Sequence, residues 1–245
     1  MSDFIAGAPD AHRPSRPQER FYAALEVILC SGFPTQLALI SVLRLAGWSV
    51  TDGHLSIGFI ATLLLLDATV VIALVVSLMR LHRESLREVF FGNRPIGREA
   101  LIGLPLTIVV FVLVIIMLTL AQQVAPWLHN VPENPLEQLI HSKWDATVFA
   151  VVATFAGGLR EEIQRAFVLR RFEQHLGGAR VGLVVFSLAF GAGHILQGWD
   201  AALTTAVLGA FWGAIYLARG SIVAPIVSHS GFNTAEIVRF AVWGL

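Results

Sequence analysis

Residues 104–121 read LPLTIVVFVLVIIMLTLA, an apolar run without a single charged side chain. A helix needs about 20 apolar residues to cross the hydrocarbon core of a bilayer, and this run with its flank (100–121) reaches that length. The rest of the chain agrees, because 56% of its 245 residues are hydrophobic and 14% are charged. Ordinary soluble domains carry about 25% charged residues. The sequence therefore predicts an integral membrane protein.

Other apolar segments lie on both sides of this run. The candidate spans are residues 21–47, 55–79, 100–121, 145 to beyond the glutamates at 161 and 162, 180–196, 201–218 and 221–243. Pro34 predicts a kink in the first, and Gly191 and Gly193 predict a break at the end of the short fifth. Asp67 lies midway along the second with no evident partner, and it is interpreted as bonding a neighbouring helix or lining a cavity. We expect an all-α fold, a polytopic membrane bundle of about seven transmembrane helices.

The distribution of arginines orients these helices. The tail before the first span and the segments after the second and fourth spans hold several arginines, and the turn after the sixth holds Arg219. The intervening loops have Lys143 as their only basic residue. The positive-inside rule then puts the N-terminus in the cytoplasm and the C-terminus outside. Residues 1–20 are polar and proline-rich, and are interpreted as a disordered cytoplasmic tail. Residues 21–245 are interpreted as one membrane domain.

Three polar clusters lie in or against the apolar segments. They are Glu161 and Glu162 with Arg165, Phe190 with His194, and His229 with Asn233. Ionisable groups at bilayer depth are costly and usually mark a functional site. Two carboxylates, two imidazoles and an amide form a set suited to general acid–base catalysis on water. Because Glu161 and Arg165 are four residues apart, they share a helix face, and Arg165 is expected to fix the Glu161 carboxylate.

Each cluster also has a simpler interpretation. Glu161 and Arg165 can form an ion pair at a helix end, His194 can pack or contact lipid headgroups, and the remaining pair can bond neighbouring helices. Zinc is a further alternative, since two histidines and a glutamate can bind it. The chain has no His-Glu-x-x-His helix, and the amide of Asn233 is a poor zinc ligand. We therefore expect no metal.

In this order, the clusters resemble the CPBP family of intramembrane proteases. That family includes the type II CAAX prenyl proteases and the Abi-type bacteriocin-processing or self-immunity proteins. Its motifs are Glu-Glu-x-x-x-Arg, Phe-x-x-x-His and His-x-x-x-Asn. The segments from Phe190 to His194 and from His229 to Asn233 match the second and third motifs in full. The resemblance covers roughly residues 145–240.

The first motif is one residue shorter than in the family, because only two residues separate Glu162 from Arg165. In an alignment on Arg165, Glu161 takes the place of the second glutamate and Arg160 that of the first. In an alignment on the pair, Glu161 is the first glutamate. One residue turns a helix by about 100°, so the two carboxylates are not interchangeable. The identity of the catalytic carboxylate stays open.

The resemblance implies a metal-independent, glutamate-dependent endopeptidase without a cofactor. A glutamate and His194 would hold and activate a water, while His229 and Asn233 would stabilise the oxyanion. Arg165 would orient the carboxylate, and Phe190 would line the substrate cavity. The implied partners are the lipid bilayer and a lipidated or hydrophobic peptide, such as a prenylated CAAX-type tail, with no nucleic acid. The oligomeric state is open.

Two other functions stay open. A non-catalytic membrane protein that binds a partner, for example a bacteriocin self-immunity protein, would use the same scaffold, and the shortened first motif favours it. A small transporter would use Asp67 and the histidines as a proton relay, although no inverted repeat is visible. For the protease, we expect the glutamates and both imidazoles to converge, with the break in the fifth segment bringing His194 inward.

Overall fold

The computed structural model describes residues 15–48 and 56–243, which are helical apart from turns and short loops. The elements are α1 (Pro17–Leu29), α2 (Phe33–Leu45), α3 (Ile57–Leu81), α4 (Leu86–Phe90), α5 (Ile96–Val124), η2 (Pro126–Leu128), η3 (Glu137–Leu139), α6 (Lys143–Val152), η4 (Ala153–Arg160), α7 (Glu161–His175), α8 (Ala179–Ala192), η5 (Ile195–Gln197), α9 (Trp199–Arg219) and α10 (Val223–Trp243). No strand occurs within the described ranges, which confirms the all-α prediction.

Within those ranges, three helices are long and apolar enough to cross a bilayer, namely α3, α5 and α9. α1 and α2 qualify together as a pair bent by 44°. Length and composition thus support three or four crossings, and they do not establish the seven that were predicted. α8 has 14 residues, fewer than the about 20 that a crossing requires. The predicted fourth span is divided into α6, η4 and α7, and it carries the glutamates.

α5 contains the apolar run from which the prediction started, and most of it is exposed. Only 11% of its most apolar window is buried within the protein. Leu104, Ile108 and Ile115 are each more than half exposed. An apolar surface of this extent suits lipid rather than water. Gly103 marks the opposite face, where a Cβ would meet the side chain of Val227 on α10.

The predicted first span is two helices, and the kink does not come from Pro34. The chain turns at Gly32, whose φ of 87° is in the left-handed region that glycine adopts without steric cost. Pro34 lies in the first turn of α2, where its missing N–H costs nothing because that donor has no partner within the helix.

Part of the predicted tail is helical as well. α1 begins at Pro17, and the Glu19 carboxylate accepts a hydrogen bond from the backbone N–H of Arg16 at 2.8 Å. The hydroxyl of Ser15 donates to the carbonyl of Gln174 near the end of α7. The predicted disorder is therefore wrong for residues 17–20, and residues 1–14 lie outside the described ranges. The single membrane domain stays a prediction.

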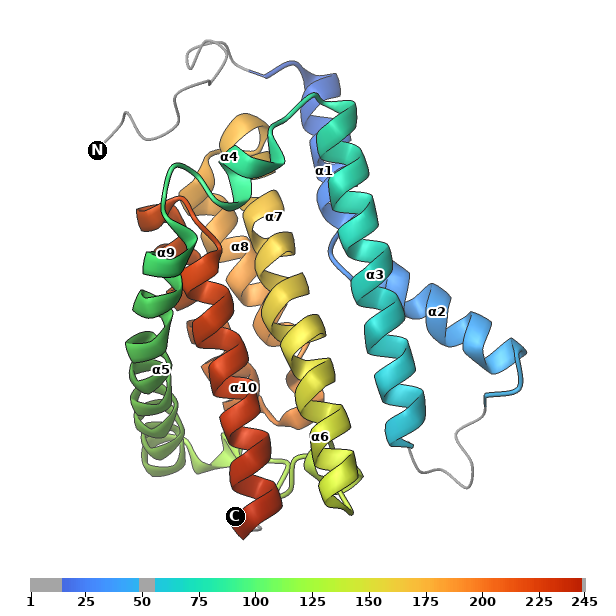
Figure 1. The fold of residues 1–245 in the computed structure, drawn as a ribbon, viewed down its shortest axis with the longest axis vertical. Coiled ribbons are helices and arrows are strands. Elements are labelled where there is room, and N and C mark those ends of the chain that lie inside the picture. Colours follow the sequence, from blue (N-terminus) through green and yellow to red (C-terminus); the bar gives the residue numbers. More distant parts are fainter. Residues whose placement is uncertain (1–14, 49–55, 244–245) are drawn as a thin grey trace.

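The long helices run roughly along the long axis of the molecule, with α2 diverging from the bundle beside α3 (Figure 1). α6, η4 and α7 follow one another without a break and form a central strut. α1, α3, α8 and α10 all contact this strut, while α5 packs on α10 and α8 on α9. Helices from both halves of the chain therefore contact this strut.

Candidate active site

The π-helical segment η4 directly precedes the paired glutamates. π-helical turns are rare and often occur at functional sites. Two glycines in η4 let α10 come close. A Cβ on Gly157 would lie 2.5 Å from Nδ2 of Asn233, and a Cβ on Gly158 would overlap the hydroxyl of Ser230. The backbone just before the glutamates is therefore held against α10.

Glu162 is directed into the protein interior. Its side chain is 1% exposed and forms an ion pair with Arg165, whose side chain is 0% exposed. Its Oε1 also accepts a hydrogen bond from Nδ1 of His229 at 2.9 Å. The expected pairing of Arg165 with Glu161 is therefore wrong. Residues three apart share a helix face as well as residues four apart, and the arginine pairs with the more deeply buried carboxylate.

His229 connects the two glutamates. Because the Glu162 carboxylate is ion-paired and can only accept, Nδ1 of His229 is the donor in their hydrogen bond. The other ring nitrogen, Nε2, lies 3.7 Å from Oε2 of Glu161. The imidazole also stacks on Trp212, with ring centroids 3.7 Å apart and an interplanar angle of 15°. The carboxylate and the indole together fix the plane of the imidazole.

His194 follows the end of α8, which stops at Ala192 and so confirms the predicted break. At Gly191 the backbone of α9 comes close, since a Cβ there would lie 2.5 Å from the carbonyl oxygen of Ala202. Nδ1 of His194 lies 2.8 Å from the carbonyl oxygen of Phe190. A carbonyl only accepts, so Nδ1 carries the hydrogen and Nε2 is the nitrogen left to bind another group.

Aromatic rings separate these groups from one another. The ring of Phe190 lies edge-to-face with both imidazoles, with centroids 5.1 Å from His194 and 6.3 Å from His229. The guanidinium of Arg165 lies 5.1 Å from the centroids of Phe186 and Phe190. Aromatic faces attract a cation, so these rings help to hold a buried arginine inside an apolar bundle.

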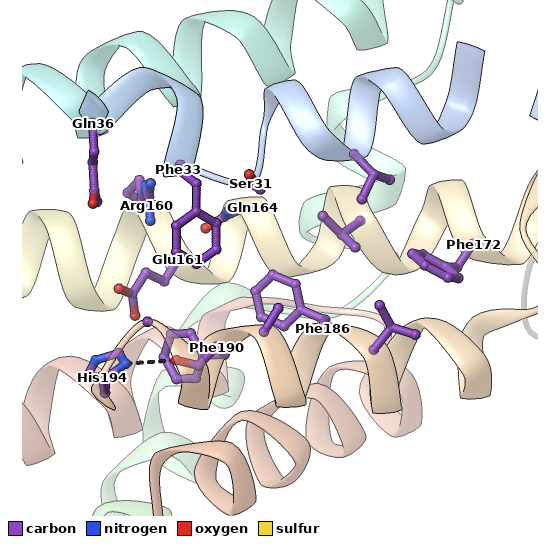
Figure 2. A pocket seen from close by; sticks show the side chains of 16 residues that line it. Ser31, Phe33, Gln36, Arg160, Glu161, Gln164, Phe172, Phe186, Phe190 and His194 are labelled. Atoms are coloured by element: carbon purple, nitrogen blue, oxygen red, sulfur yellow. Dashed lines mark hydrogen bonds between the residues drawn. The ribbon is translucent and has the colours of Figure 1, made fainter. Parts of the chain in front are cut away.

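A cavity of about 160 Å³ lies between α1, α2, η4, α7 and α8. Glu161 and His194 point toward each other across it (Figure 2). Of the predicted site residues, Glu161, His194 and Phe190 line the cavity, while Glu162, Arg165, His229 and Asn233 do not. Glu161 thus lies between the cavity, which it shares with His194, and the polar side chains that do not line the cavity.

Asp67, which has no evident partner in the sequence, bonds side chains of neighbouring helical segments, as one of its two interpretations predicted. Nη2 of Arg160 donates to Oδ2 of Asp67 at 2.6 Å, and the hydroxyl of Thr35 also donates to that carboxylate. All three residues are buried. An unpaired charge is costly in a membrane. The presence of Asp67 and Arg160 in separate apolar segments was therefore the signal in the sequence that could have indicated this ion pair.

No group of three or more His, Cys, Asp or Glu side chains among the described residues is arranged to hold a metal ion. Glu161 and Glu162 instead each lie beside a ring nitrogen of His229.

Residues 143–235 match a family model described as type II CAAX prenyl endopeptidase Rce1-like. This match confirms the resemblance that the three motifs indicated. The matched range contains η4, α7, α8 and α9 and the first part of α10, and so includes every predicted site residue. No curated protein and no solved structure matches the chain significantly.

Proposed function

We propose that the protein is an intramembrane endopeptidase that hydrolyses a lipidated or hydrophobic peptide with a water activated by Glu161 and His194. Membership of the CAAX endopeptidase family supports a protease of this general type. The observation that carries the finer proposal is the convergence of Glu161 and His194, from α7 and from the end of α8, on one cavity.

The hydrogen bond of His194 defines its part in the proposal. With Nδ1 donating to the Phe190 carbonyl, Nε2 of the neutral ring accepts a hydrogen from a water in the cavity. Glu161 takes the other proton of that water as general base, and the hydroxide attacks the scissile carbonyl carbon. The proton on Glu161 then passes to the leaving amine, so the carboxylate is regenerated at the end of the cycle.

His229 and Asn233 are proposed to stabilise the oxyanion that this attack creates. Because Nδ1 of His229 is committed to Glu162, only Nε2 can serve a substrate, and in the protonated ring it is a donor. Asn233 supplies a second donor beside the π-helical segment, where Gly157 leaves room for its amide. Arg165 acts through Glu162, so it is a positioning residue in this scheme.

The rest of the cavity supports an apolar substrate. Phe172 and Phe186 line the part away from Glu161 (Figure 2). The cavity lining also includes the aliphatic side chains of Val27, Val168, Val185 and Ala189. Such a wall stabilises a lipid chain or an aliphatic side chain by removing it from water. A prenylated CAAX-type tail combines an apolar group with a peptide bond close to it, and it is the substrate that we propose.

The test is cleavage of a synthetic peptide with an S-farnesyl cysteine followed by three aliphatic residues. We expect the purified protein to release the tripeptide with and without a chelator. His194→Ala should abolish release, while Glu236→Gln, which alters a surface ion pair with Arg239, should cleave normally. Loss of activity in chelator and its return with zinc would contradict the metal-free mechanism. Normal cleavage by His194→Ala would contradict the site.

A non-catalytic protein that binds a membrane partner is the second candidate, and the shortened first motif favours it. It predicts that the wild-type protein binds the farnesylated peptide without cleaving it. The transporter has no comparable support, because the Asp67 carboxylate is occupied by Arg160 and Thr35.

A further inference from the structure

The cavity is chemically different on the two sides of Glu161. On one side, toward the C-terminal end of α7, the rings of Phe186 and Phe172 line the cavity (Figure 2). The polar side chains on that side, Ser31 and Gln164, donate to the backbone carbonyls of Ile28 and Cys30. On the other side lie Gln36 from α2 and Arg160 from η4. A peptide that places an apolar group in the first part and its scissile bond at Glu161 therefore directs the residues that follow the bond toward Arg160.

Arg160 has more donors than its partner uses. The Asp67 carboxylate already accepts hydrogen bonds from Thr35 and, at 3.4 Å, from the amide of Gln36. Arg160 donates to it through Nη2, and its Nε is buried without a hydrogen-bond partner. A guanidinium carries five N–H donors. The residue is only 6% exposed, so bulk water does not supply the missing acceptors.

The position of the guanidinium is fixed by the surrounding backbone. It occupies the space beside Gly32 in which any Cβ would overlap it, at the break between α1 and α2. On the other side, Asp67 holds Nη2. A guanidinium held in this way at the wall of a cavity has little conformational freedom left to lose on binding. It is therefore suited to recognising an anion.

We propose that Arg160 binds a carboxylate of the substrate on the leaving-group side of the scissile bond, and that this carboxylate is the free C-terminus of the peptide. The proposal rests on the function proposed above and adds the recognition of the leaving group. Carboxylates bind arginine through short, charge-assisted and often bidentate hydrogen bonds. Asp67 balances the charge of Arg160 while the site is empty.

The experiment compares three farnesylated peptides that differ at the last residue: a C-terminal acid, the same sequence as a C-terminal amide, and an amide that ends in aspartate. We expect the wild-type protein to cleave the acid with a kcat/KM about tenfold to hundredfold above that of the amide, as expected for a charge-assisted hydrogen bond. The aspartate amide should not recover this advantage. Equal cleavage of acid and amide would overturn the proposal, and full recovery by the aspartate amide would overturn the C-terminus as the source.

In the double variant Arg160 is replaced together with its partner, so that the Asp67 carboxylate is not left buried and unpaired. The double variant Arg160→Gln/Asp67→Asn should lose the preference for the acid, and the single variant Asp67→Asn should keep it. If the double variant still prefers the acid, or if both variants lose the preference equally, the guanidinium is not the receptor and the proposal fails.

Binding of the acid and amide peptides to Glu161→Gln separates this proposal from the proposed function. A preference for the acid in binding, without cleavage by the wild type, would leave the carboxylate site standing and remove the protease. Cleavage by the wild type without any preference for the acid would support the protease and contradict the carboxylate site.

Discussion

Glu161 and Glu162 are neighbours in the sequence, but only Glu161 lines the cavity. One residue turns a helix by about 100°, so the two carboxylates enter different surroundings. Glu162 is held by Arg165 and His229 in the interior. The sequence could predict that Glu161 occupies a motif position in either register. It could not predict which carboxylate Arg165 would hold, because partners three and four residues apart are equally possible on a helix.

Glu162→Gln should therefore damage the fold. The change leaves the buried guanidinium of Arg165 without its ion-pair partner, and breaking a buried pair costs about 3–5 kcal/mol. Thermal unfolding of the purified protein in detergent measures this loss. The double variant Glu162→Gln/Arg165→Met removes both charges and should recover much of the stability. If Glu162→Gln unfolds at the wild-type temperature, the ion pair is not structural.

Asn233→Ala should slow the chemical step more than it weakens substrate binding. Loss of one oxyanion donor lowers kcat by about 10²–10³-fold, because that donor acts mainly in the transition state. Steady-state kinetics on the farnesylated peptide measures kcat and KM separately. Thr234→Val, next to it on α10, is the matched control and should keep both values. A raised KM with an unchanged kcat would show that Asn233 binds the substrate in its ground state.

At the scale of the elements, the breaks in the helices decide where the site lies. The end of α8 could be predicted, because Gly191 and Gly193 flank the residue at which the helix stops. The bend before α2 was assigned to Pro34, although Gly32 makes it, because proline in a first helical turn does not disturb the helix. The π-helical segment could not be predicted, because two glycines such as Gly157 and Gly158 permit close packing against α10 without indicating a π-helical turn.

The ends of α1, α3 and α7 are joined by a charged network. Arg171 on α7 donates to Glu26 on α1 at 2.5 Å and to Glu84 in the loop after α3 at 2.7 Å. Burial alone raises the pKa of Glu84, but the hydrogen bonds from Arg171 and Gln174 outweigh it, and the pKa lies below its ordinary value. Glu84 therefore stabilises the fold when it is ionised.

Acidification should weaken this junction. Because the folded-state pKa of Glu84 is lowered, its contribution is present above its unfolded pKa of about 4.3 and is lost as the pH falls below that value toward the folded pKa. The unfolding temperature of the wild type should drop more steeply below that pH than the unfolding temperature of Glu84→Gln. Parallel curves for the two proteins would mean that Glu84 adds no pH-dependent stability.

At the scale of the whole molecule, composition predicted a membrane protein, and three or four helical segments among the described residues are long and apolar enough to cross a bilayer. The number of crossings could not be fixed, because α8 is short and because the segments that build the site carry charged and polar side chains. The first motif lies on such a segment. The polar residues of a site reduce the mean hydropathy of the segments that carry them. Such segments are therefore harder to recognise as membrane spans from the sequence.

The predicted orientation can be tested on the two flanks of α5. Cysteines placed at Arg87, in α4, and at Glu133, in the loop after α5, should be labelled from opposite sides of the membrane, the first from the cytoplasm. Cys30 is buried, so it interferes little with this labelling. Labelling of both positions from the same side would contradict both the crossing by α5 and the alternation of arginine-rich loops.

The most direct test of the central claim is the rate of peptide cleavage by Glu161→Gln. This change keeps the shape of the side chain and removes the base. Because Glu161 lies at the cavity and outside the buried ion pair, the variant should fold normally. We predict wild-type thermal unfolding, retained binding of the farnesylated peptide and no measurable hydrolysis. Hydrolysis at the wild-type rate by folded Glu161→Gln would contradict the account.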